Sequence, residues 1–256
     1  HEIARQALHA RVREAAQRVD PQSAVVLHAP ESPQPPGSQV AWLSDLVLPH
    51  VAHPRPFDLV LHAGQRIALT GDNGSGKSTL LRVLAGQLAP CSGDYRHRGA
   101  VAYLDQQCSL IDSQVSVLDH LRAACRQRDH GNLRTRLAQL GLDAERILLP
   151  SELLSGGERL KGALAAVLYG DQPTQLLLLD EPSNHLDLPS LQALEQMLCR
   201  YQGTLLVASH DALFLQRLQL TAHLHMPHSE LHPFGGTHLG ERAQGESVVS
   251  DDGLGA

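Results

Sequence analysis

The stretch GDNGSGKST at residues 71–79 constrains the fold more than any other part of this sequence. It fits the pattern G-x-x-x-x-G-K-S/T, with the strand-like run RIALT before it and the helical pattern KSTLLRVLAG after it. In a glycine-rich turn between a strand and a helix, the backbone amides and the positive end of the helix together form an anion-binding site. A phosphate group suits such a turn, so the sequence predicts a phosphate-binding loop (P-loop) in an α/β fold.

The composition of the P-loop predicts how it would bind a nucleoside triphosphate. Lys77 is one of only two lysines in the chain, and we expect its ammonium group to bridge the β- and γ-phosphates. Ser78 is expected to ligate Mg²⁺, and Thr79 to donate to an earlier phosphate. The expected nucleotide-binding residues are therefore Gly71, Asp72, Asn73, Gly74, Ser75, Gly76, Lys77, Ser78 and Thr79.

Two acidic residues follow the apolar run QLLLLD at 175–180. Continuous apolar runs suit parallel strands buried on both faces, and ligands collect at the carboxyl ends of such strands. We expect Asp180 to hold Mg²⁺ and Glu181 to orient or deprotonate the attacking water. The alternative is that Asp-Glu-Pro is an ordinary strand exit.

The stretch LSGGE at 154–158 predicts a second phosphate-binding helix start. Ser155 and Glu158 have the spacing of a capping box at the beginning of a helix. We expect Gly156 and Gly157 behind the cap to leave backbone amides bare, so that a phosphate can approach. One γ-phosphate is not easily held by both this helix and the P-loop, unless the two come from opposite subunits.

These motifs, together with Gln106 in YLDQQ, SNHLD at 183–187 and His210 in VASHD, resemble the nucleotide-binding domain of ATP-binding-cassette (ABC) proteins. The resemblance implies an α/β P-loop fold with an antiparallel strand region and a small helical subdomain. It also implies ATP hydrolysis by two domains paired head-to-tail around two ATP molecules. Each ATP is then shared between one P-loop and the partner's Ser155, Gly156, Gly157 and Glu158. In such a pair Gln106 touches Mg²⁺, His210 contacts the γ-phosphate and Asp187 couples the two sites.

The stretch DEPSNHLD resembles DEPTNHLD of the F subfamily, which are soluble twin-cassette ATPases that act on ribosomes. Its partners are then a second cassette, either a missing amino-terminal half or a second copy, and the ribosome. We expect residues 1–20 to end a helical linker and 21–39 to be proline-rich. The cassette is expected at 40–236, with its helical subdomain near 108–153, and a disordered tail at 237–256. The ATPase subunit of a membrane transporter is the rival function, and a module that uses ATP only to clamp is another.

The adenine-stacking aromatic of the family is not evident before the P-loop. His50 in LVLPHVAHPRPF stands at the best-matching place, with His53 and Phe57 nearby. An imidazole can stack on adenine but covers less area than a larger ring. Either His50 stacks on the base or it is a histidine of a surface loop.

Composition limits the remaining possibilities. The net charge of −6 and the aromatic content of 3% disfavour a chain that wraps nucleic acid nonspecifically, so RNA contacts would need local basic patches such as the arginines of the helical subdomain. Those arginines could equally face solvent. No run of eighteen apolar residues predicts a membrane span. Four widely spaced cysteines are typical of free thiols, so we expect a cytoplasmic protein. The histidines near 223–232 lack a closed metal-site pattern.

Overall fold

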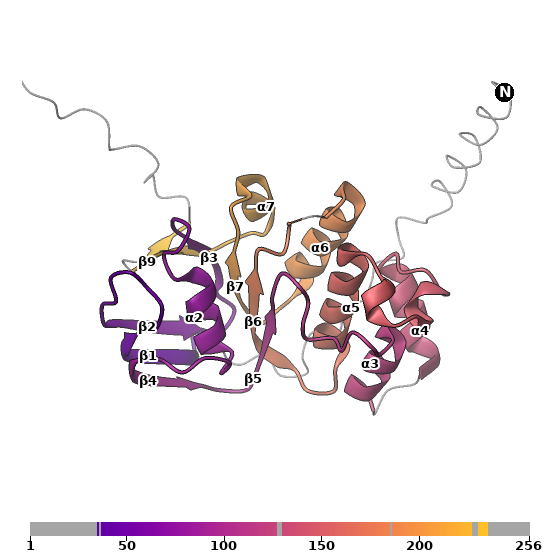
Figure 1. The fold of residues 1–256 in the computed structure, drawn as a ribbon, viewed down its shortest axis with the longest axis horizontal. Coiled ribbons are helices and arrows are strands. Elements are labelled where there is room, and N and C mark those ends of the chain that lie inside the picture. The colour runs from indigo at the N-terminus through magenta and orange to yellow at the C-terminus, as the bar shows by residue number, and fades with distance from the viewer. Residues whose placement is uncertain (1–34, 36, 127–129, 185, 227–229, 235–256) are drawn as a thin grey trace, which may run out of the picture.

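A computed structural model describes residues 35, 37–126, 130–184, 186–226 and 230–234 of the 256-residue chain. The expectations for residues 1–34 and for the tail from 237 onward lie outside the described residues. Figure 1 shows a sheet of strands at one end of the molecule, a helical region at the other end, and a central sheet between them.

The central sheet has six strands in the order β5-β6-β7-β3-β8-β9. All neighbours are parallel except β8 and β9, which form an antiparallel pair. The strand that precedes the P-loop, β3, and the strand that precedes the acidic motif, β6, therefore belong to one parallel sheet, with β7 between them. The strand bounds are β3 (Arg66–Thr70), β5 (Ala100–Leu104), β6 (Thr174–Asp180), β7 (Thr204–Ala208), β8 (Ala222–His225) and β9 (Glu230–Pro233).

The other sheet is antiparallel and has three strands in the order β2-β1-β4. Its strands are β1 (Gln39–Val47), β2 (Phe57–His62) and β4 (Ser92–His97). The runs 57–61 and 66–70 are both strands, as predicted, yet the three residues between β2 and β3, 63–65, send them into different sheets. This sheet is the antiparallel strand region that the family resemblance implies, so the predicted fold class is confirmed.

The helices are distributed over the two faces of the central sheet. α2 follows the P-loop directly, whereas α3, α4 and the short 3₁₀ turns η1 and η2 make the helical subdomain at the far end (Figure 1). Their bounds are α2 (Lys77–Leu84), α3 (Val117–Ala124), α4 (His130–Gln139), η1 (Arg146–Leu148), η2 (Ser151–Leu153), α5 (Gly156–Tyr169), α6 (Leu188–Arg200) and α7 (Ala212–Arg217).

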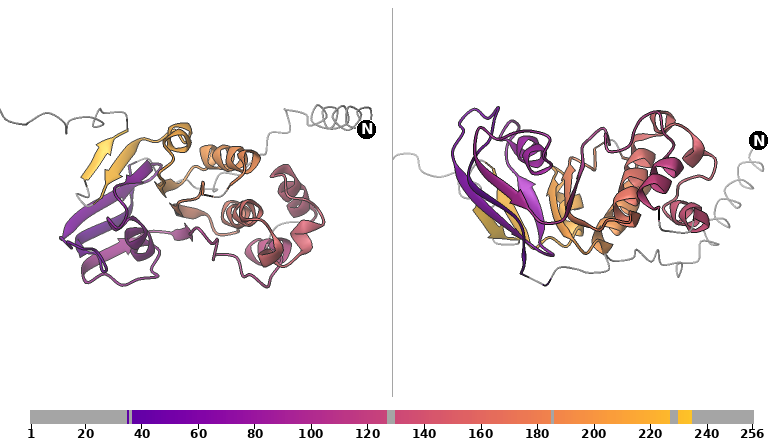
Figure 2. Two further views of the ribbon diagram at one scale, coloured as in Figure 1. Left: turned by 45° about the horizontal axis from the view of Figure 1, so that its top comes forward. Right: turned by 90° about the horizontal axis from the view of Figure 1, so that it is seen from below.

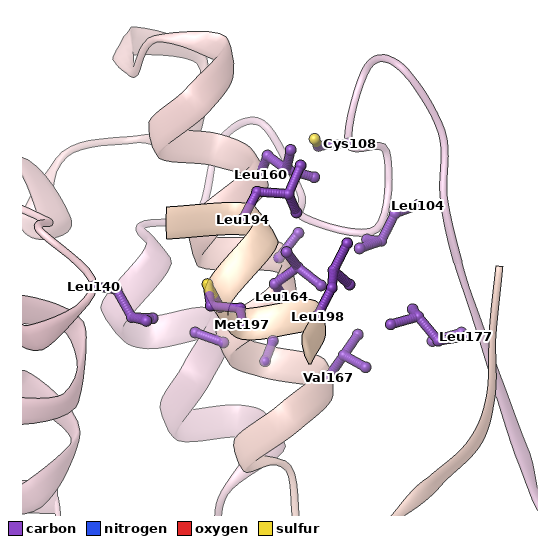
Figure 3. Packing of buried hydrophobic residues seen from close by; sticks show 14 of the residues in the cluster. Leu104, Cys108, Leu140, Leu160, Leu164, Val167, Leu177, Leu194, Met197 and Leu198 are labelled. Atoms are coloured by element: carbon purple, nitrogen blue, oxygen red, sulfur yellow. The ribbon is translucent and has the colours of Figure 1, made fainter. Parts of the chain in front are cut away.

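The core is divided in two by the central sheet. Alternating residues of β6 point to opposite faces, so Leu176 and Leu178 pack with α2 and the antiparallel sheet. Leu177 and Leu179 pack instead with α5, α6 and the helical subdomain. Figure 3 shows this second core, where leucines of α5 and α6 meet. The P-loop helix α2 and the LSGGE helix α5 therefore cover opposite faces of one sheet, as the views in Figure 2 also show.

Within the described part of the chain, no helix is both long enough and apolar enough to cross a bilayer.

Candidate functional site

The P-loop has backbone conformations that require glycine at two positions. Gly71 has a φ of 137°, and a Cβ there would lie 2.6 Å from the carbonyl oxygen of Met226. Gly76 is the N-cap of α2, with a φ of 102°. Residues that carry a side chain rarely adopt such φ angles. Glycine therefore allows the chain to turn sharply from β3 into α2. The P-loop therefore ends at the amino end of α2, where the first amides of a helix have no partner within the helix.

Lys77 is buried, and its ammonium group spans the loop. Nζ donates to the carbonyl oxygens of Gly71, at 2.7 Å, and Asp72, at 2.9 Å. An ammonium has three protons, so one remains for a further acceptor. Ser75 Oγ is buried and has no hydrogen-bond partner among the described residues. Because buried polar groups are nearly always paired, this hydroxyl indicates a ligand that accepts or donates here.

The side chains of Ser78 and Asp180 meet at the amino end of α2. Ser78 Oγ donates to Asp180 Oδ1 at 3.1 Å, and the Tyr103 hydroxyl donates to Asp180 Oδ2 at 3.1 Å. Tyr103 lies on β5, the neighbour of β6. Burial, with the nearby Asp180 carboxylate, raises the pKa of Tyr103 above its usual range, so this hydroxyl keeps its proton and remains a donor. Ser78 and Tyr103 thus fix the two oxygens of the Asp180 carboxylate from two sides.

Glu181 has an unusual backbone conformation, with a φ of 49°. Its amide donates to the Ala208 carbonyl of β7, at 2.8 Å. Its carboxylate lies beside His210: Oε1 is 3.3 Å from His210 Nε2, and Oε2 accepts from the His210 amide at 3.3 Å. A left-handed backbone conformation costs a residue other than glycine about 1–2 kcal/mol. Such strain at the end of a buried strand is typical of a functional position.

The helix start at LSGGE has the predicted capping box. Ser155 Oγ accepts from the Glu158 amide at 3.2 Å, and Glu158 Oε2 accepts from the Ser155 amide at 2.8 Å. Glu158 also binds Arg146 of η1, which lowers the pKa of the glutamate to about 2, chiefly through that hydrogen bond. The amino end of α5 is exposed at Ser155 and Gly156.

The two glycines of LSGGE differ. Gly156 has open space where a Cβ would be, in agreement with the expected bare helix start. Gly157 is buried, and a Cβ there would lie 2.7 Å from Ser190 Oγ on α6. The absence of a side chain at Gly157 therefore serves the packing of α5 on α6, not exposure. Asp187, which we expected to couple two sites, caps α6 by accepting from the Ser190 amide at 3.0 Å.

Gln106 leaves the sheet at the same edge as the acidic pair. In the β5–β6 register Leu104 is opposite Leu179, so Gln106 and Glu181 each lie two residues beyond that pair. The Gln106 side chain is exposed, so it remains available for the expected Mg²⁺ contact.

A small pocket lies beside the P-loop. Its lining includes His53 and Arg55 from the segment before β2 and Phe57 at the start of β2, together with Ser75 and Met226. His50, the expected adenine neighbour, is not part of this lining. His50 is exposed and has a φ of 57°. Of the three residues that the sequence offered near the base, His53 and Phe57 line this pocket and His50 does not.

The residues present fit both ATP and Mg²⁺. The P-loop offers amides, one buried ammonium and one unpaired buried hydroxyl, which together suit a polyphosphate. Ser78 Oγ and Asp180 Oδ1 lie 3.1 Å apart, and both are oxygen atoms of the kind that Mg²⁺ prefers as ligands.

Comparison with known proteins gives the family. The model of the ABC transporter family matches residues 55–184, which contain the P-loop, LSGGE and the acidic pair. The chain belongs to the ABC family. The predicted resemblance is confirmed, and proteins of this family carry an ATP-hydrolysing domain of this kind.

Relatives of this ABC domain include proteins named as ATP-binding proteins and one named as an ABC transporter F family member. It is 37% identical over 187 residues to the Bacillus subtilis ATP-binding protein YdiF, covering 71% of this chain and 29% of the relative. It is 35% identical over 204 residues to the Escherichia coli ATP-binding protein Uup, covering 77% of this chain and 32% of the relative. It is also 35% identical over 165 residues to ABC transporter F family member 5 of Arabidopsis thaliana, covering 63% of this chain and 24% of the relative. The ABC domain thus spans about a third or less of each relative.

Solved structures share the fold of this ABC domain. An inward-facing metal-chelate type ABC transporter matches with a TM-score of 0.61 and 22% identity, covering 76% of this chain and 82% of that one. An ATP-binding subunit of an ABC transporter matches with a TM-score of 0.61 and 21% identity, covering 73% and 85%.

Two residues of the site were missed by sequence reasoning. The position of Tyr103 could have been predicted in part. Side chains alternate along a strand, so a strand that ends near Gln106 places Tyr103 on a definite face of the sheet. No sequence pattern indicates the contact between Arg146 and Glu158, because the two residues are 12 positions apart and lie on different elements of the ABC domain.

Proposed function

We propose that this domain closes head-to-tail on a second cassette, around two ATP molecules, and that the closure drives a soluble, ribosome-associated translation factor in the cytoplasm. The observation that carries the shared site is the placement of the two phosphate-binding helix starts. α2 and α5 lie on opposite faces of one sheet, so one γ-phosphate does not reach both within a single chain (Figure 1).

In the proposed site the P-loop amides and Lys77 bind the β- and γ-phosphates. Two backbone carbonyls hold the Lys77 ammonium group in place. Its remaining proton is therefore preorganised to donate to the phosphates. Bound Mg²⁺ would polarise the β- and γ-phosphate oxygens, and Ser78, Asp180 and Gln106 would hold it. Tyr103 keeps the Asp180 carboxylate in one orientation.

Glu181 and His210 act on the attacking water. The Glu181 carboxylate is fixed by the ring and the amide of His210, which leaves it poised to orient water or accept its proton. The His210 side chain is 57% exposed, so its ring can also reach the γ-phosphate. From the partner, the hydroxyl of Ser155 and the bare amide end of α5 complete the γ-phosphate contacts.

A mixing experiment tests the shared site. Lys77→Ala removes the P-loop cation, and Gly156→Asp places a carboxylate in open space where the γ-phosphate would approach. Each variant alone should be inactive. A mixed pair keeps one complete site, made of the P-loop of one variant and the LSGGE of the other, so activity should return on mixing. Gly156→Asn, which is nearly isosteric and uncharged, is the control and should lose less. Two variants that stay inactive when mixed would contradict the shared site.

The ribosome role is supported by the SNHLD motif and by the likeness to a protein named as an F family member. The test uses the full-length protein with Glu181→Gln and the equivalent change in the other cassette. Closure of the two cassettes should then trap the factor on the ribosome. Co-sedimentation with ribosomes in ATP but not in ADP is the expected result. Trapping on membranes would instead favour the rival function, an ATPase subunit of a transporter.

A further inference from the structure

Arg146 makes a bidentate contact with the signature glutamate. Its Nε donates to Glu158 Oε1, and its Nη2 donates to Glu158 Oε2 at 2.8 Å. The same Nη2 donates to the carbonyl oxygen of Leu153 at 3.1 Å, just before LSGGE. Arg146 belongs to η1 of the helical subdomain, whereas Glu158 belongs to α5. One guanidinium therefore joins the helical subdomain to both ends of the LSGGE turn.

Glu158 presents an electrostatic difficulty for a phosphate site. Its carboxylate is in the first turn of α5 and accepts from the Ser155 amide at 2.8 Å. The γ-phosphate of a partner's ATP is proposed to approach that same turn. Two anions close together repel strongly when water is excluded between them. The capping box thus fixes the turn but brings a negative charge to the place where a negative ligand must bind.

The neighbourhood offers a direct solution. The Arg146 guanidinium satisfies both carboxylate oxygens of Glu158, and the fork geometry of arginine fits that arrangement. The Glu158 side chain is 19% exposed, and so its charge is screened more by Arg146 than by water. Ser155 Oγ accepts from the Glu158 amide, so the hydroxyl proton stays available for a phosphate oxygen.

We propose that Arg146 is a positioning residue for the signature: it neutralises Glu158 and holds the LSGGE turn so that the partner's γ-phosphate can bind at Ser155 and Gly156. This role rests on the proposed function, because it needs an ATP shared between two cassettes. Arg146 touches no substrate and acts through Glu158.

A purely structural role is the alternative, in which Arg146 only ties η1 to α5. The two roles predict different double variants. If the charge of Glu158 is what Arg146 controls, then Glu158→Gln removes the need for Arg146, since Gln can still accept from the Ser155 amide. If Arg146 only holds the subdomain in place, Glu158→Gln gives no relief.

The experiment measures ATP-dependent association of the full chain in a Glu181→Gln background, by analytical ultracentrifugation, for Arg146→Ala, Arg146→Lys, Glu158→Gln and the Arg146→Ala/Glu158→Gln pair. ATP affinity of the isolated chain is measured alongside, because the P-loop of the same chain does not use Arg146. Arg122→Ala is the matched control, since Arg122 pairs with exposed Asp119 elsewhere in the helical subdomain.

We expect Arg146→Ala to weaken the ATP-dependent dimer about tenfold or more, with ATP affinity of the single chain unchanged. Arg146→Lys should recover part of the loss, Arg122→Ala should match the parent, and the double variant should match Glu158→Gln alone. A dimer unaffected by Arg146→Ala, or a double variant as weak as Arg146→Ala, would overturn the proposal. A parent chain that binds ATP but never associates would overturn the shared site and this role with it.

Discussion

The Nε2 atom of His210 lies 3.3 Å from the Oε1 atom of Glu181, although the two residues are 29 positions apart. They follow adjacent parallel strands, β6 and β7, whose carboxyl ends meet at one edge of the sheet. The Glu181 side chain is 11% exposed and the His210 side chain 57% exposed. The carboxylate is thus fixed from the protein side, while the imidazole remains open to a ligand.

The first prediction follows from this pair. Glu181→Gln should lower ATP hydrolysis by a factor of about 10²–10⁴, because Gln cannot accept the proton from water. ATP binding should remain, and the ATP-bound dimer should live longer. Phosphate release and calorimetry measure the two effects. Glu152→Gln, at an exposed carboxylate of η2, is the control and should hydrolyse ATP normally. Hydrolysis that survives Glu181→Gln would contradict the assignment of the base.

Lys77→Ala should weaken ATP binding by about 2–4 kcal/mol, since it removes a charge-assisted contact to phosphate. The measurement is calorimetric titration with ATP. Because Lys77 also binds two loop carbonyls, thermal unfolding without ATP should be measured in parallel. Arg82→Ala removes an exposed cation from the same helix and should leave the affinity unchanged. Unchanged ATP binding by Lys77→Ala would remove the P-loop assignment.

Tyr103→Phe should lower the free energy of unfolding by about 1 kcal/mol and raise the Mg²⁺ concentration needed for ATP binding and hydrolysis. The reason is that Asp180 Oδ2 loses its donor and its orientation. Tyr95→Phe is the matched control, because the Tyr95 hydroxyl donates to the Leu84 carbonyl at 2.6 Å, at the end of α2 away from the P-loop. It should cost similar stability with no change in Mg²⁺ dependence. The same Mg²⁺ curve for both variants would sink this role.

The pH dependence of stability should contain a contribution from Glu158. Arg146 and the Ser155 amide hold the pKa of Glu158 at about 2, below its ordinary 4.5. A depressed carboxyl pKa stabilises the fold above the unfolded-state value, and that stability is lost as pH falls from about 4.5 to 2. In Glu158→Gln the fall over this window should be smaller. Urea unfolding at a series of pH values measures it, and identical slopes in both proteins would contradict it.

His53→Ala should weaken ATP binding more than His50→Ala does. His53 lines the pocket beside Ser75, whereas His50 lies outside that lining. Stacking on a base contributes about 1–3 kcal/mol for an aromatic ring, so the His53 effect should fall at or below that range. Titration with ATP and with inorganic triphosphate, which has no base, gives the comparison. A larger loss for His50→Ala would restore the original expectation from the sequence.

The sequence by itself determined the local parts of this protein. The P-loop, the capping box of Ser155 and Glu158 and the apolar strands were readable because each depends on neighbours within a few positions. The positive φ angles of Gly71 and Gly76 belong to the turn itself, although Gly71 also lies against the distant Met226 carbonyl. These features predicted the fold class and the two helix starts at which we propose that phosphate binds.

Tertiary structure decided everything that depends on distant partners. Ser78 meets Asp180 across 102 positions, and Arg146 meets Glu158 from another element. Gly157 faces Ser190, so packing explains a glycine that the motif alone assigns to phosphate. Hydrophobic periodicity says which side of a strand is buried, but not which strand becomes its neighbour. That choice comes from burial of two separate cores on one sheet, and it brings the groups that we propose to be catalytic to a single edge of the sheet.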